Sequence, residues 1–557
     1  MIRGSVPAAL RGRFMPTPSA LRRCYAIPKT ASSPIYRAEP TPAPFPSCSS
    51  RYSTGARPSE AQHDAAADAA TATATANQDA SSPQALAADA APSSSPASSR
   101  IASDVEAWEY NPDAKVESFQ DLPHPNFGAN QHIPFDAEFK EVLRAIPWQF
   151  RAPIRYAFAY GSGVFPQSKP HGRVPTDEEL RAIHPKAPLA VQRAQDGTPK
   201  MIDFIFGVSH TQHWHSLNMK QHRHHYSALA GLGSGAVSWV QDKLGAGVYF
   251  NPYVVVNGIL IKYGVVQLAT LERDLTQWDT LYLAGRLHKP VKILRDDPKI
   301  RLANQMNLLS ALRTALLLLP PTFTEEELYS TIAGISYLGD PRMALPTENP
   351  RKVRNIVGNN MASFRRLYLP LIETLPNVDF TSPIPASSTS TAAAATAAAD
   401  WIRDETLALR LAQDMDPVKR SNMVRRLPKA FREKLYERYQ RKLAIPAEQF
   451  KRIMDESRQE DSVAFRRREG GGFERRIAQD DPDELRAYIR AVIKQTISWP
   501  ATSQSLKGPL TAGWSRTWRY LREKMDKYKQ GKQEKKKDGN GEGKAGEDAG
   551  ERGGNQA

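Results

Sequence analysis

Four short runs of β-branched and aromatic residues lie between positions 156 and 268, and they constrain the fold more than any other feature of the sequence. Each is long enough for one strand and is bounded by glycine, proline or polar residues. The runs are YAFAYG at 156–161, MIDFIFGV at 201–208, GVYFNPYVVV at 247–256 and ILIKYGVVQL at 259–268. Asn257 and Gly258 separate the last two runs, and this pair is typical of a β-hairpin turn. The pattern predicts a mixed α/β region from about Val105 to about Leu294.

Beyond residue 294 the spacing of apolar residues becomes helical. The run at 304–319 predicts a long helix, and Thr324 with Glu327 forms a capping box that opens another. We therefore expect an α+β protein. Its predicted parts are a mixed-sheet domain at 105–294, a mainly helical domain at 295–500 with a disordered Ala/Ser/Thr insert at 385–399, and a disordered Lys/Glu/Gly tail at 530–557.

The N-terminal segments have compositions that do not build a core. Residues 1–38 are rich in arginine and contain no acidic residue, which is typical of a mitochondrial presequence, although a basic disordered tail has the same composition. Residues 39–104 are mostly Ala, Ser, Thr and Pro, and we expect a disordered linker. The only cysteines, Cys24 and Cys48, lie in these segments. No disulfide framework is therefore expected in the folded part.

The charge balance indicates an anionic partner. A net charge of +16 and a pI of about 9.6 suit nucleic acid, a nucleotide or an acidic membrane surface, and composition does not choose among them. The longest apolar run, at 311–320, contains Arg313 and is far shorter than the roughly 20 residues that span a bilayer. We therefore expect membrane contact to be peripheral.

Gly161, Ser162 and Gly163 follow the first predicted strand. Such a loop is either an ordinary tight turn or a phosphate-binding loop with converging N–H groups and a serine hydroxyl. The next strand contains one charge, Asp203, among large apolar residues. A carboxylate is costly to bury there unless a cation or donors meet it, and a Mg²⁺ ion bound to substrate phosphates would do so.

A small-residue loop after one strand and an aspartate on the next is the arrangement of nucleotidyltransferases, and further motifs make the resemblance specific. From about Phe135 to Tyr520 the chain resembles the mitochondrial phosphatidate cytidylyltransferases, the matrix CDP-diacylglycerol synthases also described as translocator assembly and maintenance proteins. The motifs are YGSGVFPQ, IDFIFGV, HWHSLNMKQHRHHYS, GAGVYFNPYV, IKYGVV, LYLAGRLHKPVKI, ISYLGDPRM and ENPRKVRNIV.

The resemblance implies both a fold and a reaction. The fold is a nucleotidyltransferase-like sheet domain followed by a helical part with a winged-helix-like domain. The reaction is transfer of CMP from CTP to phosphatidic acid, with release of pyrophosphate, at the matrix face of the inner membrane. Gly161, Ser162 and Gly163 would cradle the triphosphate, and Asp203 would hold Mg²⁺.

The usual carboxylate pair of this superfamily is incomplete, because Ile205 stands where a second carboxylate is expected. Asp340, Asp274 and Asp279 are candidates for the second metal ligand, and Asp340 is our choice. Each also suits a helix cap or a surface charge.

Basic residues in two motifs are candidate phosphate ligands. Lys262 lies in an apolar strand, where it either meets an anion or extends to the sheet edge. The segment AGRLHKPVKIL gathers Arg286, Lys289 and Lys292, of which the family motif favours Arg286 and Lys292. A solvated basic face is the alternative.

Six histidines lie between positions 210 and 225, and such a group raises the hypothesis of a zinc site. Their spacing fits neither a His-x-Glu nor a His-Glu-x-x-His motif, and no cysteine is near, so we predict no zinc site. We expect His215 and Tyr226 to line the nucleotide cleft or cap a helix, and residues 222–225 to face solvent.

A last segment, 505–529, is predicted to be an amphipathic helix. Trp514, Trp518 and Leu521 share one stripe, and Arg519 is among the basic residues around it. Tryptophan with arginine and lysine suits an anionic membrane interface, although the helix could also pack on its own domain.

Two other functions fit parts of these observations. A nucleotidyltransferase acting on an RNA end would also suit the basic charge, but the chain shows no common RNA-binding module, and we expect no nucleic-acid partner. A non-catalytic, membrane-associated assembly factor would make the loop a plain turn and Asp203 a structural acid.

Overall fold

The computed structural model describes residues 116–167, 175–195, 199–343, 351–382, 401–404, 407–462, 470–519, 522 and 525. The predicted presequence, linker, Ala-rich insert and C-terminal tail, and also Leu521, lie outside the described residues.

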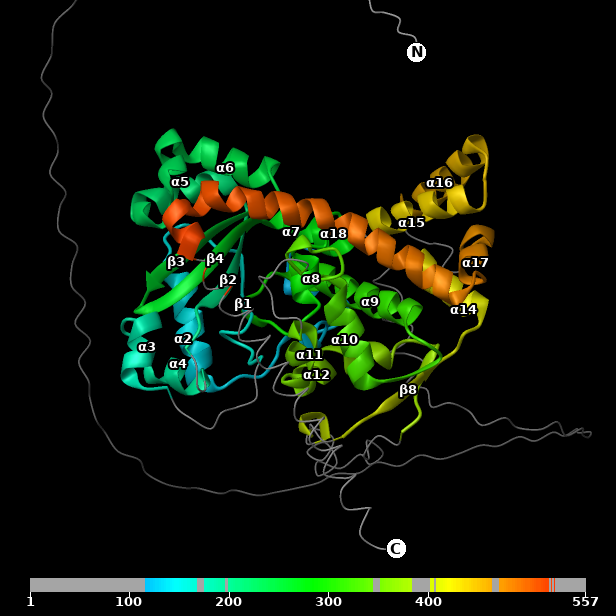
Figure 1. The fold of residues 1–557 in the computed structure, drawn as a ribbon, viewed down its shortest axis with the longest axis horizontal. Coiled ribbons are helices and arrows are strands. Elements are labelled where there is room, and N and C mark those ends of the chain that lie inside the picture. Colours follow the sequence, from blue (N-terminus) through cyan, green and yellow to red (C-terminus); the bar gives the residue numbers. More distant parts are fainter. Residues whose placement is uncertain are drawn as a thin grey trace, which may run out of the picture. The chain divides into compact units, whose positions relative to one another are not determined.

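A five-stranded mixed sheet forms the first half, with the strand order β3-β4-β2-β1-β5 (Figure 1). β2 and β4 run parallel, and the other neighbours are antiparallel. The strands are β1 (Tyr156–Tyr160), β2 (Ile202–Val208), β3 (Val248–Val256), β4 (Ile259–Gln267) and β5 (Lys292–Arg295). All four predicted strands are confirmed. So is the hairpin, since Asn257 and Gly258 both have positive φ angles, as a type I′ turn requires.

Helices cover both faces of this sheet. The helices up to β5 are α2 (Ala137–Trp148), α3 (Asp177–Ile183), α4 (Leu189–Ala194), α5 (Thr211–Gln221), α6 (Gly233–Lys243), α7 (Leu268–Gln277) and α8 (Ala284–Leu287). Short 3₁₀ turns add η1 (Phe119–Asp121), η2 (Ala129–Gln131), η3 (Arg223–His225) and η4 (Ala228–Leu232). Trp214 of α5 packs on Tyr263 of β4, so α5 covers the face that carries Phe206. The capping box of Thr176 and Glu179 opens α3.

The second half begins with α9 (Pro298–Leu318), which is buried almost all round, as a central core helix requires. After it come β6 (Thr322–Thr324), α10 (Glu325–Ile335), η5 (Pro341–Met343), α11 (Lys352–Gly358), α12 (Met361–Ile372), β7 (Val378–Phe380) and β8 (Arg410–Gln413). The three strands form an antiparallel sheet in the order β6-β8-β7. The order of helix, strand, helices and two strands is consistent with the winged-helix-like domain that the resemblance implied. The α+β fold class is confirmed.

A layer of further helices completes the described chain: α14 (Pro417–Arg425), α15 (Lys429–Lys442), α16 (Ala447–Ser462), α17 (Gly472–Ala478) and α18 (Pro482–Ala512). α18 runs from the side of α14 and α17 to β3 and α6, and so joins the helical part to the sheet (Figure 1). It differs from the predicted 505–529 helix. Residues 505–512 belong to α18, which ends at Gly513, where a φ of +82° stops the helix before a new one starts at Trp514.

Candidate functional site

The loop after β1 closes tightly against β2. Gly161 has a φ of +81°, and a Cβ there would lie 3.2 Å from Oδ2 of Asp203. A Cβ at Gly163 would lie 2.7 Å from the carbonyl oxygen of Met201, closer than side chains come. Glycine is therefore needed at both positions, and the loop backbone lies directly beside the Asp203 carboxylate.

Ser162, between the two glycines, presents donors that no other described residue uses. Within the described ranges, neither its hydroxyl nor its N–H has a hydrogen-bond partner, and the same holds for the N–H of Gly163. Adjacent donors of this kind in a turn form an anion-binding concavity.

Asp203 lies in a row of three residues across the sheet. Its antiparallel partner is Tyr160, the last residue of β1, and its parallel partner is Lys262 of β4. The ammonium of Lys262 lies 3.4 Å from Oδ1 of Asp203, and both side chains are largely buried. Oδ1 itself is buried without a hydrogen bond among the described residues. Lys262 thus supplies charge that the lone carboxylate needs but leaves part of its hydrogen-bonding capacity unused.

Arg286 reaches the same row from α8. Its guanidinium lies over the ring of Tyr282, 4.0 Å from the centroid, and Nε is 3.5 Å from the hydroxyl of Tyr160. Burial raises the pKa of Tyr160, on which the charges of Arg286, Asp203 and Lys262 also act. The structure therefore brings Arg286 to the predicted loop, aspartate and lysine.

Two more lysines extend this positive region. The ammonium of Lys289 donates to the hydroxyl of Ser336 at 2.9 Å, and it lies 5.1 Å from the centroid of Tyr337. Lys352, from α11, approaches the same ring at 5.1 Å. Burial, together with the charges of Arg286 and Lys352, holds the pKa of Lys289 well below its usual value. No described carboxylate forms an ion pair with Lys289.

The sequence analysis did not select Lys289 as a phosphate ligand and did not consider Lys352, although both lie in motifs that carry the resemblance. It chose Lys292 instead, which the structure places elsewhere. Lys292 pairs with Ala159, on the face of the sheet opposite to Tyr160, and its ammonium donates to the carbonyl of Ile133 at 2.6 Å. A phosphate-binding role for Lys292 is still a prediction, but this arrangement does not favour it.

The three candidate second carboxylates have different surroundings. Asp274 is buried and accepts hydrogen bonds from the backbone of Leu281, Leu283 and Ala284, so it caps a turn. Asp279 pairs with Arg273 at 2.6 Å near the surface. Asp274 and Asp279 therefore fit the alternative interpretation, in which they are a cap and a surface charge and not metal ligands.

Asp340 lies in the turn after α10, where its N–H donates to the carbonyl of Tyr337. Its backbone is thus joined to Tyr337, whose ring Lys289 and Lys352 approach, and its role as a metal ligand is still a prediction. Among the residues with described positions, Asp203 belongs to no group of three carboxylate, imidazole or thiol ligands. Its carboxylate fits Mg²⁺ only in the mode in which phosphates and water complete the shell.

The histidine interpretation needs two corrections. His215 is fully buried and bonds to the Tyr226 hydroxyl and to Gln241, each at 2.8 Å, so it holds α5, η3 and α6 together and lines no cleft. Burial lowers its pKa to about 4. His225 does not face solvent. It is buried against Tyr263, and burial lowers its pKa to about 3.

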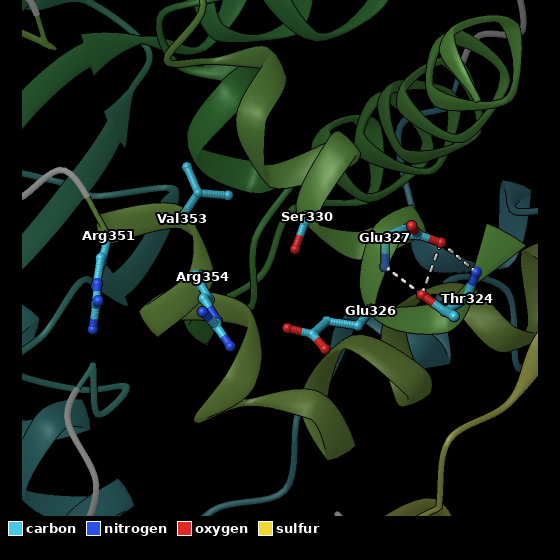
Figure 2. A pocket seen from close by; sticks show the side chains of 7 residues that line it. All are labelled: Thr324, Glu326, Glu327, Ser330, Arg351, Val353 and Arg354. Atoms are coloured by element: carbon cyan, nitrogen blue, oxygen red, sulfur yellow. Dashed lines mark hydrogen bonds between the residues drawn. The ribbon is translucent and has the colours of Figure 1, made fainter. Parts of the chain in front are cut away.

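A shallow hollow of about 570 Å³ lies between α10 and α11, away from the Asp203 row. Figure 2 shows Glu326 extending toward Arg354, with Arg351 beside them and the capping box of Thr324 at the edge. The hollow contains neither Asp203 nor the loop. Charged groups and the donors of Ser162 converge instead at the sheet, beside Asp203.

The chain is similar in sequence to one family of known proteins. A family model described as "Phosphatidate cytidylyltransferase, mitochondrial" matches residues 143–527. Relatives with that same name include those of Schizosaccharomyces pombe, 44% identical over 251 residues, Saccharomyces cerevisiae, 41% over 273, and Homo sapiens, 40% over 246. These alignments cover 45%, 48% and 44% of this chain and 58%, 64% and 48% of the respective relatives. The matched segment thus spans less than two thirds of each relative.

Proposed function

The chain belongs to the mitochondrial phosphatidate cytidylyltransferase family, and on this premise we propose that it transfers CMP from CTP to phosphatidic acid, which yields CDP-diacylglycerol and pyrophosphate. The observation that carries the proposal is the position of Asp203. Its carboxylate lies beside the backbone of the Gly-Ser-Gly loop and pairs with the ammonium of Lys262. The neighbouring strand residue Tyr160 contacts Arg286 through its hydroxyl.

The chemistry requires positioned phosphates more than a strong base. The phosphate oxygen of phosphatidic acid is already ionised, so it can attack the α-phosphorus of CTP while the bond to the pyrophosphate oxygen breaks. The N–H groups and hydroxyl of Gly161, Ser162 and Gly163 would hold the triphosphate. Asp203 would hold Mg²⁺, which neutralises phosphate charge when bound.

The leaving pyrophosphate gains negative charge as the bond breaks. Arg286, Lys289 and Lys352 lie together on the side of Tyr160 and Tyr337, and we assign them to the β- and γ-phosphates. Stabilising charge where it develops is a large catalytic contribution in transfer reactions of this kind.

The lipid substrate requires contact with a bilayer, and exposed tryptophans supply a surface for it. Trp514 and Trp518, in the helical segment after α18, are 80% and 71% exposed, and the guanidinium of the adjacent Arg519 lies 4.5 Å from the ring centroid of Tyr253. No described helix is both long and apolar enough to cross a bilayer. We propose that this surface binds anionic lipid at the matrix face of the mitochondrial inner membrane, as a peripheral contact.

Turnover of the full chain tests the enzymatic proposal. The assay follows CDP-diacylglycerol made from CTP, Mg²⁺ and phosphatidic acid in vesicles. Asp203→Asn should lower the rate at least about 100-fold in protein that is still folded, because the metal loses its protein ligand. Asp279→Asn is the matched control and should keep near-full activity. An Asp203→Asn protein with normal turnover would remove the aspartate from the mechanism.

Nucleotide binding separates the enzyme from an assembly factor. A ligand that binds only the native state raises its stability. CTP with Mg²⁺ should therefore raise the thermal midpoint of the wild-type protein. A midpoint that is independent of CTP would favour the non-catalytic alternative.

A further inference from the structure

Three histidines at the junction of α5 and η3 gather into one cluster. One ring nitrogen from each of His222, His224 and His225 lies within 4.8 Å of the other two. The rings of His222 and His225 are nearly parallel with centroids 4.4 Å apart, and the His224 ring is 4.5 Å from that of His225. The His-x-His-His spacing matches neither zinc motif considered above, yet the turn at His222, which ends α5 and starts η3, folds the three imidazoles together.

Contacts outside the cluster orient two of the rings. Nδ1 of His225 is 2.9 Å from the hydroxyl of Tyr263, which leaves Nε2 for another partner. The ring of His222 packs edge-on against Phe150, with the centroids 5.6 Å apart. Its Nε2 is nevertheless buried and has no hydrogen-bond partner among the described residues. Outer partners of this kind hold imidazole ligands in place in metal sites, and an orphaned buried nitrogen needs an explanation.

The ligand set selects the class of cation. Imidazole nitrogens suit Zn²⁺, Cu²⁺ and Ni²⁺, whereas Mg²⁺ prefers oxygen. Three protein nitrogens with water in the fourth position is a common zinc arrangement. We propose that His222, His224 and His225 form a binding site for a transition-metal cation such as Zn²⁺, separate from the nucleotide site.

The two sites lie on opposite faces of the sheet. Tyr263, which contacts His225, follows Lys262 in β4, and successive side chains of a strand point to opposite faces. A metal at the histidines is therefore not the metal that we assign to Asp203, and its binding does not depend on the proposed reaction.

The geometry requires a modest closure. At Zn–N distances of about 2.0–2.1 Å, tetrahedral nitrogens lie about 3.3 Å apart, so the rings must move together and one of the parallel pair must turn. The side chain of His224 is exposed to solvent. Arg516 donates to the carbonyl oxygens of His224 and His225 at 2.7 and 2.8 Å. Its positive charge opposes the cation, so we expect weaker binding than at a buried structural zinc site. Closure would also fix the turn that anchors the segment starting at Trp514.

Calorimetric titration with ZnCl₂ tests the site. The protein is the full chain without an affinity tag, with Cys24→Ser and Cys48→Ser to remove competing thiols, in excess Mg²⁺. One Zn²⁺ should bind per chain, and His224→Ala should weaken binding at least about tenfold, since even loss of an outer partner costs 10–100-fold. His213→Ala, an exposed histidine on α5, is the matched control and should bind as the parent does.

Cobalt absorption gives a second readout that does not depend on activity. Co²⁺ in the parent protein should show visible bands of a low-coordinate nitrogen site, and these bands should disappear in His224→Ala and persist in His213→Ala. Equal zinc affinity in the parent and His224→Ala, or equal loss in the His213→Ala control, would overturn the proposal.

Discussion

Lys507 is the buried charge whose removal has the best-defined consequence. It lies in α18 with 1% of its surface exposed, and its ammonium faces the end of α6. It donates to the carbonyl of Leu244 at 2.7 Å and approaches those of Val240 and Gln241 at 3.4 and 3.3 Å. Burial lowers its pKa from 10.5 to about 7, and the charge of Asp242 opposes this shift only in part.

The sign of the pH dependence follows from this shift. Between about pH 7 and 10.5 the unfolded chain holds the Lys507 proton more tightly than the folded chain does, so stability rises with pH across that window. The slope approaches about 1.4 kcal/mol per pH unit, and from pH 7 to pH 9 the gain is roughly 2 kcal/mol. Well below pH 7 Lys507 is protonated in both states, and this contribution is constant.

Lys507→Met should remove that gain. Urea unfolding is measured at pH 7 and pH 9 for the parent, for Lys507→Met and for Lys220→Met, an exposed lysine on α5 that serves as the control. Loss of the carbonyl contacts changes the stability of Lys507→Met at both pH values, so only the difference between them counts. Other lysines titrate equally in all three proteins and cancel. Parallel pH profiles for parent and Lys507→Met would show that Lys507 has an ordinary pKa and refute the reasoning.

Three further predictions concern the loop, the cation cluster and the membrane surface. Gly163→Ala should cost about 1–3 kcal/mol in chemical unfolding, because its Cβ meets the carbonyl of Met201, whereas Gly334→Ala, in α10 with no atom near its Cβ, should gain about 0.5–1 kcal/mol. Lys289→Met should raise the thermal midpoint of the ligand-free protein, since it removes a repelled buried charge, and yet raise KM for CTP several-fold in steady-state assays. Trp518→Ala should weaken binding to anionic vesicles in sedimentation assays at least about tenfold, as loss of a buried aromatic costs about 1.5–3 kcal/mol, and unchanged sedimentation would place the membrane contact elsewhere.

The strands were predictable because their signal is local. Each apolar run is bounded by turn residues, and the Asn257-Gly258 pair needs only its own backbone angles to specify a hairpin. The order β3-β4-β2-β1-β5 was not predictable from these runs, because it depends on long-range pairing such as that of β2 with β4. The end of α18 was missed for a related reason. The apolar stripe continues past Gly513, and only the backbone conformation there shows that the helix stops.

Some residues of the candidate site were predictable from the sequence, and others were not. Asp203 and Lys262 were identifiable because a charge in an apolar strand is conspicuous, but the sequence did not show that each is the other's partner. Lys289 and Lys292 are three residues apart and look alike in sequence. The strand β5 sends Lys292 to the Ile133 carbonyl, while α8 ends just before Lys289 and leaves it facing Ser336. Which face of the sheet a strand residue points to depends on its position in the strand, and this position is known only when the first and last residues of the strand are known.

Positive side chains gather near Tyr160 and Tyr337 in the ligand-free site. Burial holds the pKa of Lys289 well below its usual value, and repulsion from Arg286 and Lys352 lowers it further, while Lys262 is already engaged by Asp203. A bound triphosphate would relieve the repulsion among the first three, and a Mg²⁺ ion at Asp203 would compete with Lys262 and release it toward the phosphates. The triphosphate and Mg²⁺ should therefore bind with positive cooperativity. The metal frees Lys262 to bind the phosphates, and the phosphates supply further ligands for the metal. A site that served only to stabilise the fold would have no reason to keep a buried lysine beside two like charges.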